Sequence, residues 1–268
     1  MTLMRLELLS RHRIHDPSLG LNEPSGLTLN RDGSALYTIS HDTKAIFRLD
    51  LEGRVSVSDS FFIDLDDLEG IAIRGDDNEL LLVQEQSNSV VVVDLKSSTE
   101  RYRRPLSAMT NYDTIAHHFP DPSDNNGLEG ITLNTKNNNV VVVKEQQPGL
   151  LIELDSSLTT ILSTRVLQPS QGFVHPELKA EQLDFSGLSY DSSSDTFWIV
   201  SDKGRCLFQY DWAGDTVLQR LDLTISTGDK PKRIRKPEAV AFDPGRNRMY
   251  VVSDRDGYLY VFRLHENC

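Results

Sequence analysis

Apolar and polar residues follow a pattern along this 268-residue chain that occurs five times. The copies are each 31 residues long, align without a gap and span residues 23–53, 67–97, 127–157, 184–214 and 236–266. Each copy begins with apolar residues that alternate with small ones, as in Leu27-Thr28-Leu29, and this period of two is typical of a strand. A nearly continuous apolar run follows, and a third apolar run ends the copy. Successive copies start 44, 60, 57 and 52 residues apart, and short strands repeated at such intervals predict a β-propeller.

A propeller blade has four strands, and each copy accounts for three of them. Apolar segments after the first four copies supply a fourth strand, whereas the fifth copy ends at residue 266, close to the C-terminus. We predict that residues 3–9, in which Met4, Leu6 and Leu8 alternate with charged residues, form the outer strand of the last blade and close the ring. The expected fold is an all-β, single-domain, five-bladed β-propeller over residues 1–268.

Acidic residues recur at two positions of the repeat. The third position holds Ser25, Glu69, Glu129, Ser186 and Glu238, and the nineteenth holds His41, Glu85, Glu145, Asp202 and Asp254. The third position starts the first strand of a copy, and the nineteenth ends the second. Because these strands are expected to be antiparallel neighbours, all ten positions should lie at the same end of the propeller. Seven of the ten are carboxylates, so we expect an acidic channel mouth.

Carboxylates gathered at one mouth repel one another, and some would keep their protons at neutral pH. A bound divalent cation relieves this repulsion, and carboxylate oxygens suit Ca²⁺ or Mg²⁺, of which we expect Ca²⁺. The predicted metal ligands are Glu69, Glu129, Glu238, Glu85, Glu145, Asp202 and Asp254. Two alternatives stay open. Neighbouring cations (Lys144, Lys203 and Arg255) could relieve the repulsion instead, or the acids could accept hydrogen bonds from backbone N–H groups.

Other candidate ligand-binding residues lie in the connections between copies. The long segments 111–126 and 168–183 lead into inner strands and are expected to hang over the channel mouth, bringing His117, His118 and His175 there. Segment 230–236 holds five cations in seven residues, and we expect Lys232, Arg233 and Arg235 to bind a phosphate or carboxylate near the cation.

Three phrases in successive copies resemble one protein family. They are NNGLEGITLN with VVVVKEQQPGLLIELD, LDFSGLSYD with FWIVSDKGRCLFQYD, and KPEAVAFD with MYVVSDRDGYLYVF. In order and spacing they resemble the SdiA-regulated, YjiK-like family of bacterial propellers, and the resemblance covers nearly the whole chain. It implies a propeller with a capacity for calcium and implies little about activity.

Bulk composition narrows the classes of partner that the protein is expected to bind. The formal net charge of −12 disfavours nucleic acid and anionic membranes as partners. Neither a secretory signal nor a run of 18 apolar residues is present in the chain, so we expect a cytoplasmic protein without a membrane span, and a monomer. Cys206 and Cys268 lack the spacing of metal ligands and are expected to be free thiols.

Three functions fit these features. The first is a binding or scaffold propeller that takes a small anionic ligand or a protein partner at its cation-loaded acidic face. The second is a metal-dependent hydrolase of phosphoesters, lactones or esters, in which Glu129 and His41 would be catalytic and His41 would move protons. The third is a protein-interaction platform without metal. Metal analysis of the purified protein and a hydrolase screen would separate them.

Overall fold

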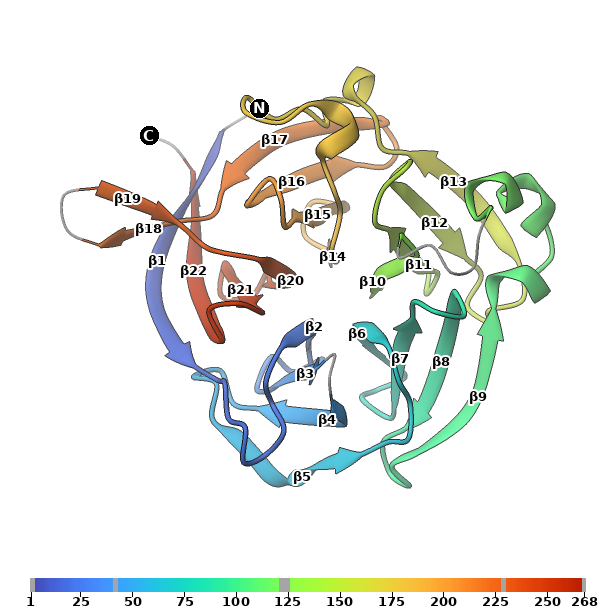
Figure 1. The fold of residues 1–268 in the computed structure, drawn as a ribbon, viewed down its shortest axis with the longest axis horizontal. Coiled ribbons are helices and arrows are strands. Elements are labelled where there is room, and N and C mark those ends of the chain that lie inside the picture. The colour runs from blue at the N-terminus through green and yellow to red at the C-terminus, as the bar shows by residue number, and fades with distance from the viewer. Residues whose placement is uncertain (1–2, 41–42, 121–125, 228–229, 267–268) are drawn as a thin grey trace.

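The computed structural model describes residues 3–40, 43–120, 126–227 and 230–266. They form five antiparallel four-stranded sheets arranged around one axis (Figure 1). The predicted five-bladed β-propeller is therefore confirmed. The helical segments in this part of the chain are five short 3-10 turns, and none of its helices is long and apolar enough to cross a membrane.

Each blade runs from an inner strand near the axis to an outer strand at the rim. Blade one comprises β2 (Pro24–Leu29), β3 (Leu36–Ser40), β4 (Thr43–Leu49) and β5 (Val55–Phe62). Blade two comprises β6 (Leu68–Arg74), β7 (Glu79–Gln84), β8 (Ser89–Asp94) and β9 (Thr99–Pro105). Blade three comprises β10 (Leu128–Leu133), β11 (Val140–Lys144), β12 (Leu150–Leu154) and β13 (Ile161–Val166). Blade four comprises β14 (Gly187–Asp191), β15 (Thr196–Ser201), β16 (Cys206–Asp211) and β17 (Thr216–Asp222). Blade five comprises β20 (Pro237–Asp243), β21 (Arg248–Ser253), β22 (Tyr258–Glu266) and β1 (Met4–Arg13).

The N-terminal strand closes the ring, as the sequence predicts. Strand β1 pairs antiparallel with β22 from Met4–Glu266 to Arg13–Tyr258, so it is four residues longer at its C-terminal end than expected. Its apolar side chains Met4, Leu6 and Leu8 pack against the apolar cluster between blades four and five, while Arg5 and Glu7 between them are exposed. Both chain ends therefore belong to one sheet (Figure 1).

The core consists of five apolar clusters, each between two neighbouring blades. In the cluster between blades two and three, Val90 and Val92 of β8 pack with Val140 and Val142 of β11. Burial on both faces explains the nearly continuous apolar sequence of the second strands, because a strand in mid-blade faces a neighbouring blade on each side.

The inner strands approach one another closely through a ring of glycines at the fourth repeat position: Gly26, Gly70, Gly130 and Gly187. A Cβ atom on Gly130 would lie 2.8 Å from the Cα atom of Gly187 and 2.9 Å from the side chain of Leu188 in the next blade. Since real Cβ atoms do not approach backbone atoms so closely, a methyl group here would push two blades apart.

We therefore predict that Gly130→Ala lowers the free energy of unfolding by about 1–3 kcal/mol, the usual cost of overpacking. Gly245→Ala is the matched control, because the nearest atom to its added Cβ is 3.3 Å away and belongs to the Asp243 side chain. Denaturant unfolding of both variants provides the measurement. Equal stability of the two would contradict the close-approach explanation.

The described residues of the two long connections do not line the acidic end of the channel, contrary to expectation. The first, residues 111–126, follows η1 (Leu106–Ala108), forms η2 (Tyr112–Thr114) and η3 (Ala116–His118), and lies in its described part at the outer rim beside β9 and β13 (Figure 1). Leu106, Met109 and Ile115 belong to the apolar cluster between blades two and three, and this burial explains the outward position. Residues 121–125 of this segment lie outside the described residues.

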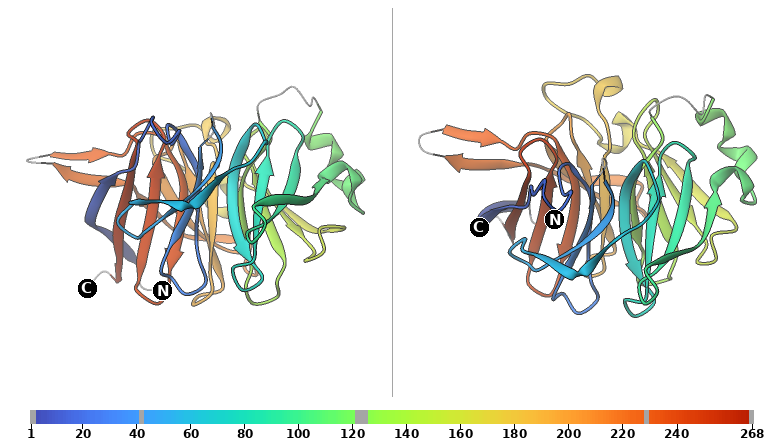
Figure 2. Two further views of the ribbon diagram at one scale, coloured as in Figure 1. Left: turned by 90° about the horizontal axis from the view of Figure 1, so that it is seen from below. Right: turned by 60° about the horizontal axis from the view of Figure 1, so that its bottom comes forward.

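The second long connection forms η4 (Pro169–Gln171) and η5 (Ala180–Gln182) and packs on blade four. Its Phe173 is buried, with ring centroids 5.3 Å from Phe185 and 5.2 Å from Phe208. Segment 230–236 begins in a hairpin of β18 (Thr224–Thr227) and β19 (Lys230–Arg233), which projects sideways from the ring (Figure 2).

Candidate functional site

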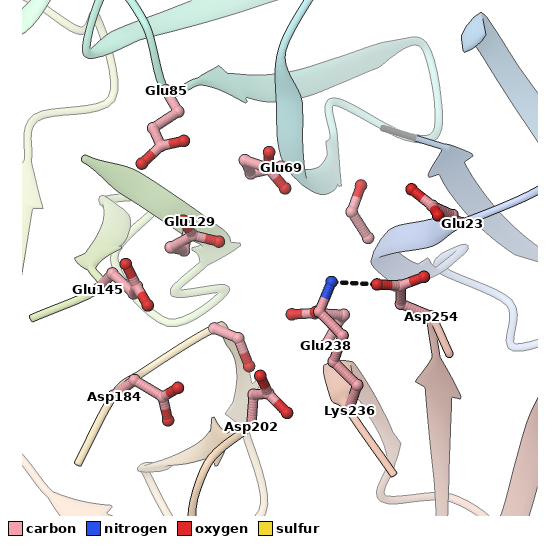
Figure 3. Close-up of a pocket in the computed structure, with 12 residues that line it drawn as sticks. Glu23, Glu69, Glu85, Glu129, Glu145, Asp184, Asp202, Lys236, Glu238 and Asp254 are labelled. Carbon is pink, nitrogen blue, oxygen red and sulfur yellow. Dashed lines mark hydrogen bonds and ion pairs between the residues drawn. The ribbon is translucent and has the colours of Figure 1, made fainter. Parts of the chain in front are cut away.

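A cavity of about 250 Å³ lies at the end of the axis where the inner strands begin. It is lined by Glu23, Ser25, Glu69, Glu85, Glu129, Glu145, Asp184, Ser186, Asp202, Lys236, Glu238 and Asp254. Nine of these twelve residues are acids, and their carboxylates point toward a common centre (Figure 3). We call this site the acidic cavity. All seven carboxylates expected to converge line it, whereas their role as metal ligands stays a prediction.

A β-bulge turns the third repeat position toward the axis. In β6, β10 and β20 the pairing with the next strand skips one residue, and the skipped residues are Glu69, Glu129 and Glu238. Strand β2 skips Ser25 in the same way. A bulge leaves its extra residue out of the ladder and redirects that side chain. The bulges therefore explain why these glutamates face the cavity and not a neighbouring blade.

The serines at the third position have a structural role. Ser25 Oγ donates a hydrogen bond of 3.0 Å to the backbone oxygen of Leu68 in the next blade. Ser186 Oγ donates an equivalent bond of 3.2 Å to Pro237. Blades one and four thus contribute a link between inner strands where blades two, three and five contribute a carboxylate.

Burial raises the pKa of two glutamates in blades two and three, Glu85 and Glu129. Burial raises the pKa of Glu85 to about 7, and the charges of Glu69 and Asp67 act in the same direction. Burial also raises the pKa of Glu129 well above its usual value, with contributions from Glu69, Glu85 and Glu145. Neither Glu85 nor Glu129 forms an ion pair with a lysine or arginine of the described residues.

Lysines compensate several acids of blades three to five. The Lys236 ammonium lies 3.3 Å from Glu238 and also pairs with Asp254 (Figure 3). Burial would lower the pKa of Lys236, but the hydrogen bond to Asp254 and the charge of Glu238 outweigh it and raise that pKa. Lys203 lies 3.6 Å from Glu145 and 3.7 Å from Asp184. Of the cations considered for relieving the repulsion, Lys203 does so on one side of the cavity, and Lys236, which was not among them, acts in the same way.

Even on that side, burial keeps several acids partly protonated. It raises the pKa of Glu238 to about 8 and that of Asp202 to about 6, with help from neighbouring carboxylates. The lysines reduce both shifts without removing them. Some acids also accept backbone hydrogen bonds, as the other alternative supposed: Glu85 accepts one of 2.9 Å from the Gly127 N–H, and Asp184 one of 3.0 Å from Lys203.

Three acids of blade two lie close enough together to share a metal ion. One carboxylate oxygen each from Asp67, Glu69 and Glu85 lie within 4.8 Å of one another. Asp67 is fixed beside the cavity because its carboxylate accepts a 2.5 Å hydrogen bond from the Gln86 N–H and its backbone oxygen accepts one from Glu85. Its φ of 60° lies in the left-handed region, which Asp tolerates better than most residues. We call this group the blade-two triad.

Sequence reasoning missed four of these residues, and all occupy the first repeat position. They are Glu23, Asp67, Asp184 and Lys236. The twelve residues of the acidic cavity come only from repeat positions one, three and nineteen. The signal was present, but the first position holds a lysine in one copy and Gly127 in another, so it does not look like an acidic ring.

The other predicted site residues that the structure describes do not line the acidic cavity. His41 lies outside the described residues. His117 and His118 lie at the rim in η3, with ring centroids 3.8 Å apart and ring planes inclined by 44°. Arg233 pairs with Glu177, and Arg235 with Asp256, while Lys232 is exposed in the hairpin. These five residues are therefore not brought together around the acidic cavity.

Fold and site define a class: a five-bladed β-propeller with an acidic cavity at one end of its axis. The chain belongs to the SdiA-regulated family, whose family model matches residues 12–263. This agrees with the resemblance seen in the sequence.

Solved structures agree with the fold. The crystal structure of Myxococcus xanthus glutaminyl cyclase is 11% identical and has a TM-score of 0.66, over 100% of this chain and 99% of that chain. A chain in a crystal structure of the mitotic checkpoint complex is 12% identical and has a TM-score of 0.48, over 88% of this chain and 60% of that chain. At such identities the first similarity shows the fold alone, and the second adds nothing to it.

Proposed function

We propose that this protein binds a divalent cation, Ca²⁺ rather than Mg²⁺, at the blade-two triad, and that the cation-loaded mouth binds a further ligand. The observation that carries the proposal is the approach of three carboxylate oxygens to within 4.8 Å. Oxygens on opposite sides of a bound Ca²⁺ are about 5 Å apart, so three oxygens within 4.8 Å of one another are close enough to contact one such ion. A Mg²⁺ ion needs shorter bonds of about 2.1 Å and a stricter octahedron.

The distribution of charge around the cavity also supports a cation site at the blade-two triad. Lys236 and Lys203 already neutralise acids of blades three to five, whereas Glu85 and Glu129 have no such partner in the described chain. Cation binding and proton binding therefore compete at Glu85, whose pKa of about 7 means that the ion displaces protons near neutral pH. Glu129 lies beside the triad and could provide a further oxygen ligand (Figure 3).

The test is the response of thermal stability to calcium. A ligand that binds only the folded protein stabilises it by about 2.7 kcal/mol at a concentration of 100 Kd, which corresponds to a rise in Tm of about 5 °C for a chain of this size. We expect such a rise with Ca²⁺ and a smaller one with Mg²⁺ at equal concentration. The Glu69→Gln, Glu85→Gln variant should lose the response and, in the presence of a chelator, melt at or above the parent temperature because charge repulsion is reduced.

Glu181→Gln provides the matched control. It removes a carboxylate from an exposed position in η5, away from the acidic cavity, and should keep the full calcium response. A calcium response that survives in the Glu69→Gln, Glu85→Gln variant would place the ion elsewhere. A parent protein that gains no stability from Ca²⁺ and binds none in calorimetry would remove the proposal.

Binding is preferred over the hydrolase hypothesis because no observation in the described residues favours catalysis. That hypothesis needs a proton carrier beside the metal, and its candidate His41 lies outside the described residues. The interaction-platform hypothesis has no carrying observation either, since the acidic cavity is a recess of molecular size and not a flat face.

A further inference from the structure

A second, basic pocket of about 360 Å³ adjoins the acidic cavity. It is lined by Asp202, Lys203, Arg205, Arg235, Lys236 and Arg255. Five of these six residues are cations, although the whole chain carries a net charge of −12. The two sites share Asp202 and Lys236, so a ligand of modest size could reach both.

Three of the five cations have acidic partners within the protein. Lys203 lies near Glu145 and Asp184, Lys236 pairs with Glu238 and Asp254, and Arg235 pairs with Asp256. The other two, Arg205 and Arg255, form no ion pair or side-chain hydrogen bond with any residue that the structure describes. Two guanidinium groups without an ion-pair partner in the described chain thus line a pocket whose other lining side chains are mostly positive.

The backbone of Arg205 adds an independent argument. Arg205 has a φ of 50°, in the left-handed region that costs an ordinary side chain about 1 kcal/mol or more. The equivalent turn position holds Asn88 in blade two and Gly257 in blade five, which are residue types that tolerate this conformation. An arginine is less favourable than Asn or Gly for this turn, which is consistent with a role of its side chain outside the turn.

Arg255 also occupies a repeat position at which the residue type differs between blades. The twentieth repeat position holds Lys203 and Arg255 in blades four and five but Gln86 and Gln146 in blades two and three. The cations therefore gather on the side of the mouth opposite the blade-two triad. A ligand lying across the mouth would meet guanidinium groups at one end and the acidic cavity at the other.

We propose that Arg205 and Arg255 bind an oxyanion group, a phosphate or a carboxylate, of a small ligand that extends from the basic pocket toward the acidic cavity. Guanidinium groups recognise such groups through paired N–H donors, and two of them can hold the oxygens of one group. This binding does not require a cation. Contact between the ligand and a cation at the blade-two triad is an extension that rests on the proposed function.

The experiment titrates phenyl phosphate and benzoate into the full chain by calorimetry at constant ionic strength, first with a chelator and then with Ca²⁺. We expect at least one of them to bind in chelator, and the comparison of the two identifies which oxyanion the pocket prefers. A tighter Kd with Ca²⁺ supports contact with the cation. Binding in chelator that Ca²⁺ does not tighten supports the oxyanion site and contradicts only the contact with the cation. The two proposals can therefore fail separately.

Three variants test the roles of Arg205 and Arg255. Arg255→Ala should weaken binding at least tenfold. Arg205→Gly should weaken it similarly and also raise Tm, because glycine relieves the left-handed conformation. A structural role for Arg205 would instead lower Tm. Arg205→Lys keeps the charge without the paired donors and should bind with intermediate affinity.

Lys96→Ala is the matched control, because it removes a positive charge from an exposed position between β8 and β9, outside both pockets, and should leave the Kd unchanged. Weakening by Lys96→Ala as large as that by Arg255→Ala would show a general charge effect and overturn the site. The proposal is also overturned if neither probe binds the parent protein, or if Arg205→Gly and Arg255→Ala bind within twofold of it.

Discussion

Removal of residues 1–12 is expected to lower the free energy of unfolding by about 5 kcal/mol or more, a large share of the 5–15 kcal/mol of an ordinary domain. The deletion removes nearly all of β1 and its ladder with β22. Each lost hydrogen bond costs about 1 kcal/mol, and the apolar contacts of Met4, Leu6 and Leu8 with the cluster between blades four and five are lost as well. It also leaves β22 as an open edge that can pair with another chain.

Denaturant unfolding and size-exclusion chromatography measure both effects. Leu6→Asp in the full chain should destabilise without shortening the protein, because it places a charge against the same apolar cluster. Arg5→Ala, on the exposed face of β1, is the control and should change stability by less than about 0.5 kcal/mol. A truncated protein with the unfolding midpoint and elution volume of the parent would show that β1 does not hold the ring closed.

The second large effect is a loss of stability as pH rises in the absence of divalent cations. The pKa values of Glu85 and Glu238 are raised to about 7 and about 8 in the folded protein, above the usual 4.5. Between pH 4.5 and these raised pKa values, the folded state therefore holds more protons than the unfolded state. The stability that the two protonated groups contribute is fully present below about pH 4.5 and is lost as pH rises toward 8. For Glu85 alone the loss is about 3 kcal/mol.

Unfolding free energies measured in chelator from pH 5 to pH 9 test this slope. Glu85→Gln should flatten it, while Glu181→Gln should not, and saturating Ca²⁺ should flatten it in the parent. Burial lowers the pKa of His175, which gives an opposite slope near its usual 6.5, so the parent is compared with each variant at every pH. A parent whose stability is constant or rises from pH 6 to pH 8 without cations would contradict the raised pKa values.

The repeated sequence pattern predicted the fold well because it reflects which side chains are buried between blades. The apolar run of a second strand reflects contact with two neighbouring blades, and the alternation of Met4, Leu6 and Leu8 reflects the single buried face of an outer strand. Such constraints act on every blade alike and therefore appear in every copy. The β-bulges were not predicted, although they are what turns Glu69 and its equivalents toward the axis.

The site was less predictable because the residue types at its repeat positions change from one copy to the next. The first position changes from acid to glycine to lysine, so the sequence does not reveal that Lys236 compensates Glu238 within the same cavity. The polar sequence of segment 111–126 predicts a loop over the mouth, but its described residues lie at the rim, where Ile115 and the preceding Leu106 and Met109 pack into the apolar cluster between blades two and three. Segment 230–236 looked like one basic cluster, yet Arg233 and Arg235 each have an acidic partner outside the acidic cavity.

Ring closure between β1 and β22 has a consequence for synthesis. During translation β1 is made long before β22, so four blades can assemble while the fifth still lacks β22, the strand that pairs with β1. Until then, the apolar face of β1 is exposed and its backbone is available to other chains. The interval between the first and last strands is thus the period in which nascent chains of this protein are most exposed to misassembly, and slower elongation through the fifth blade would lengthen it.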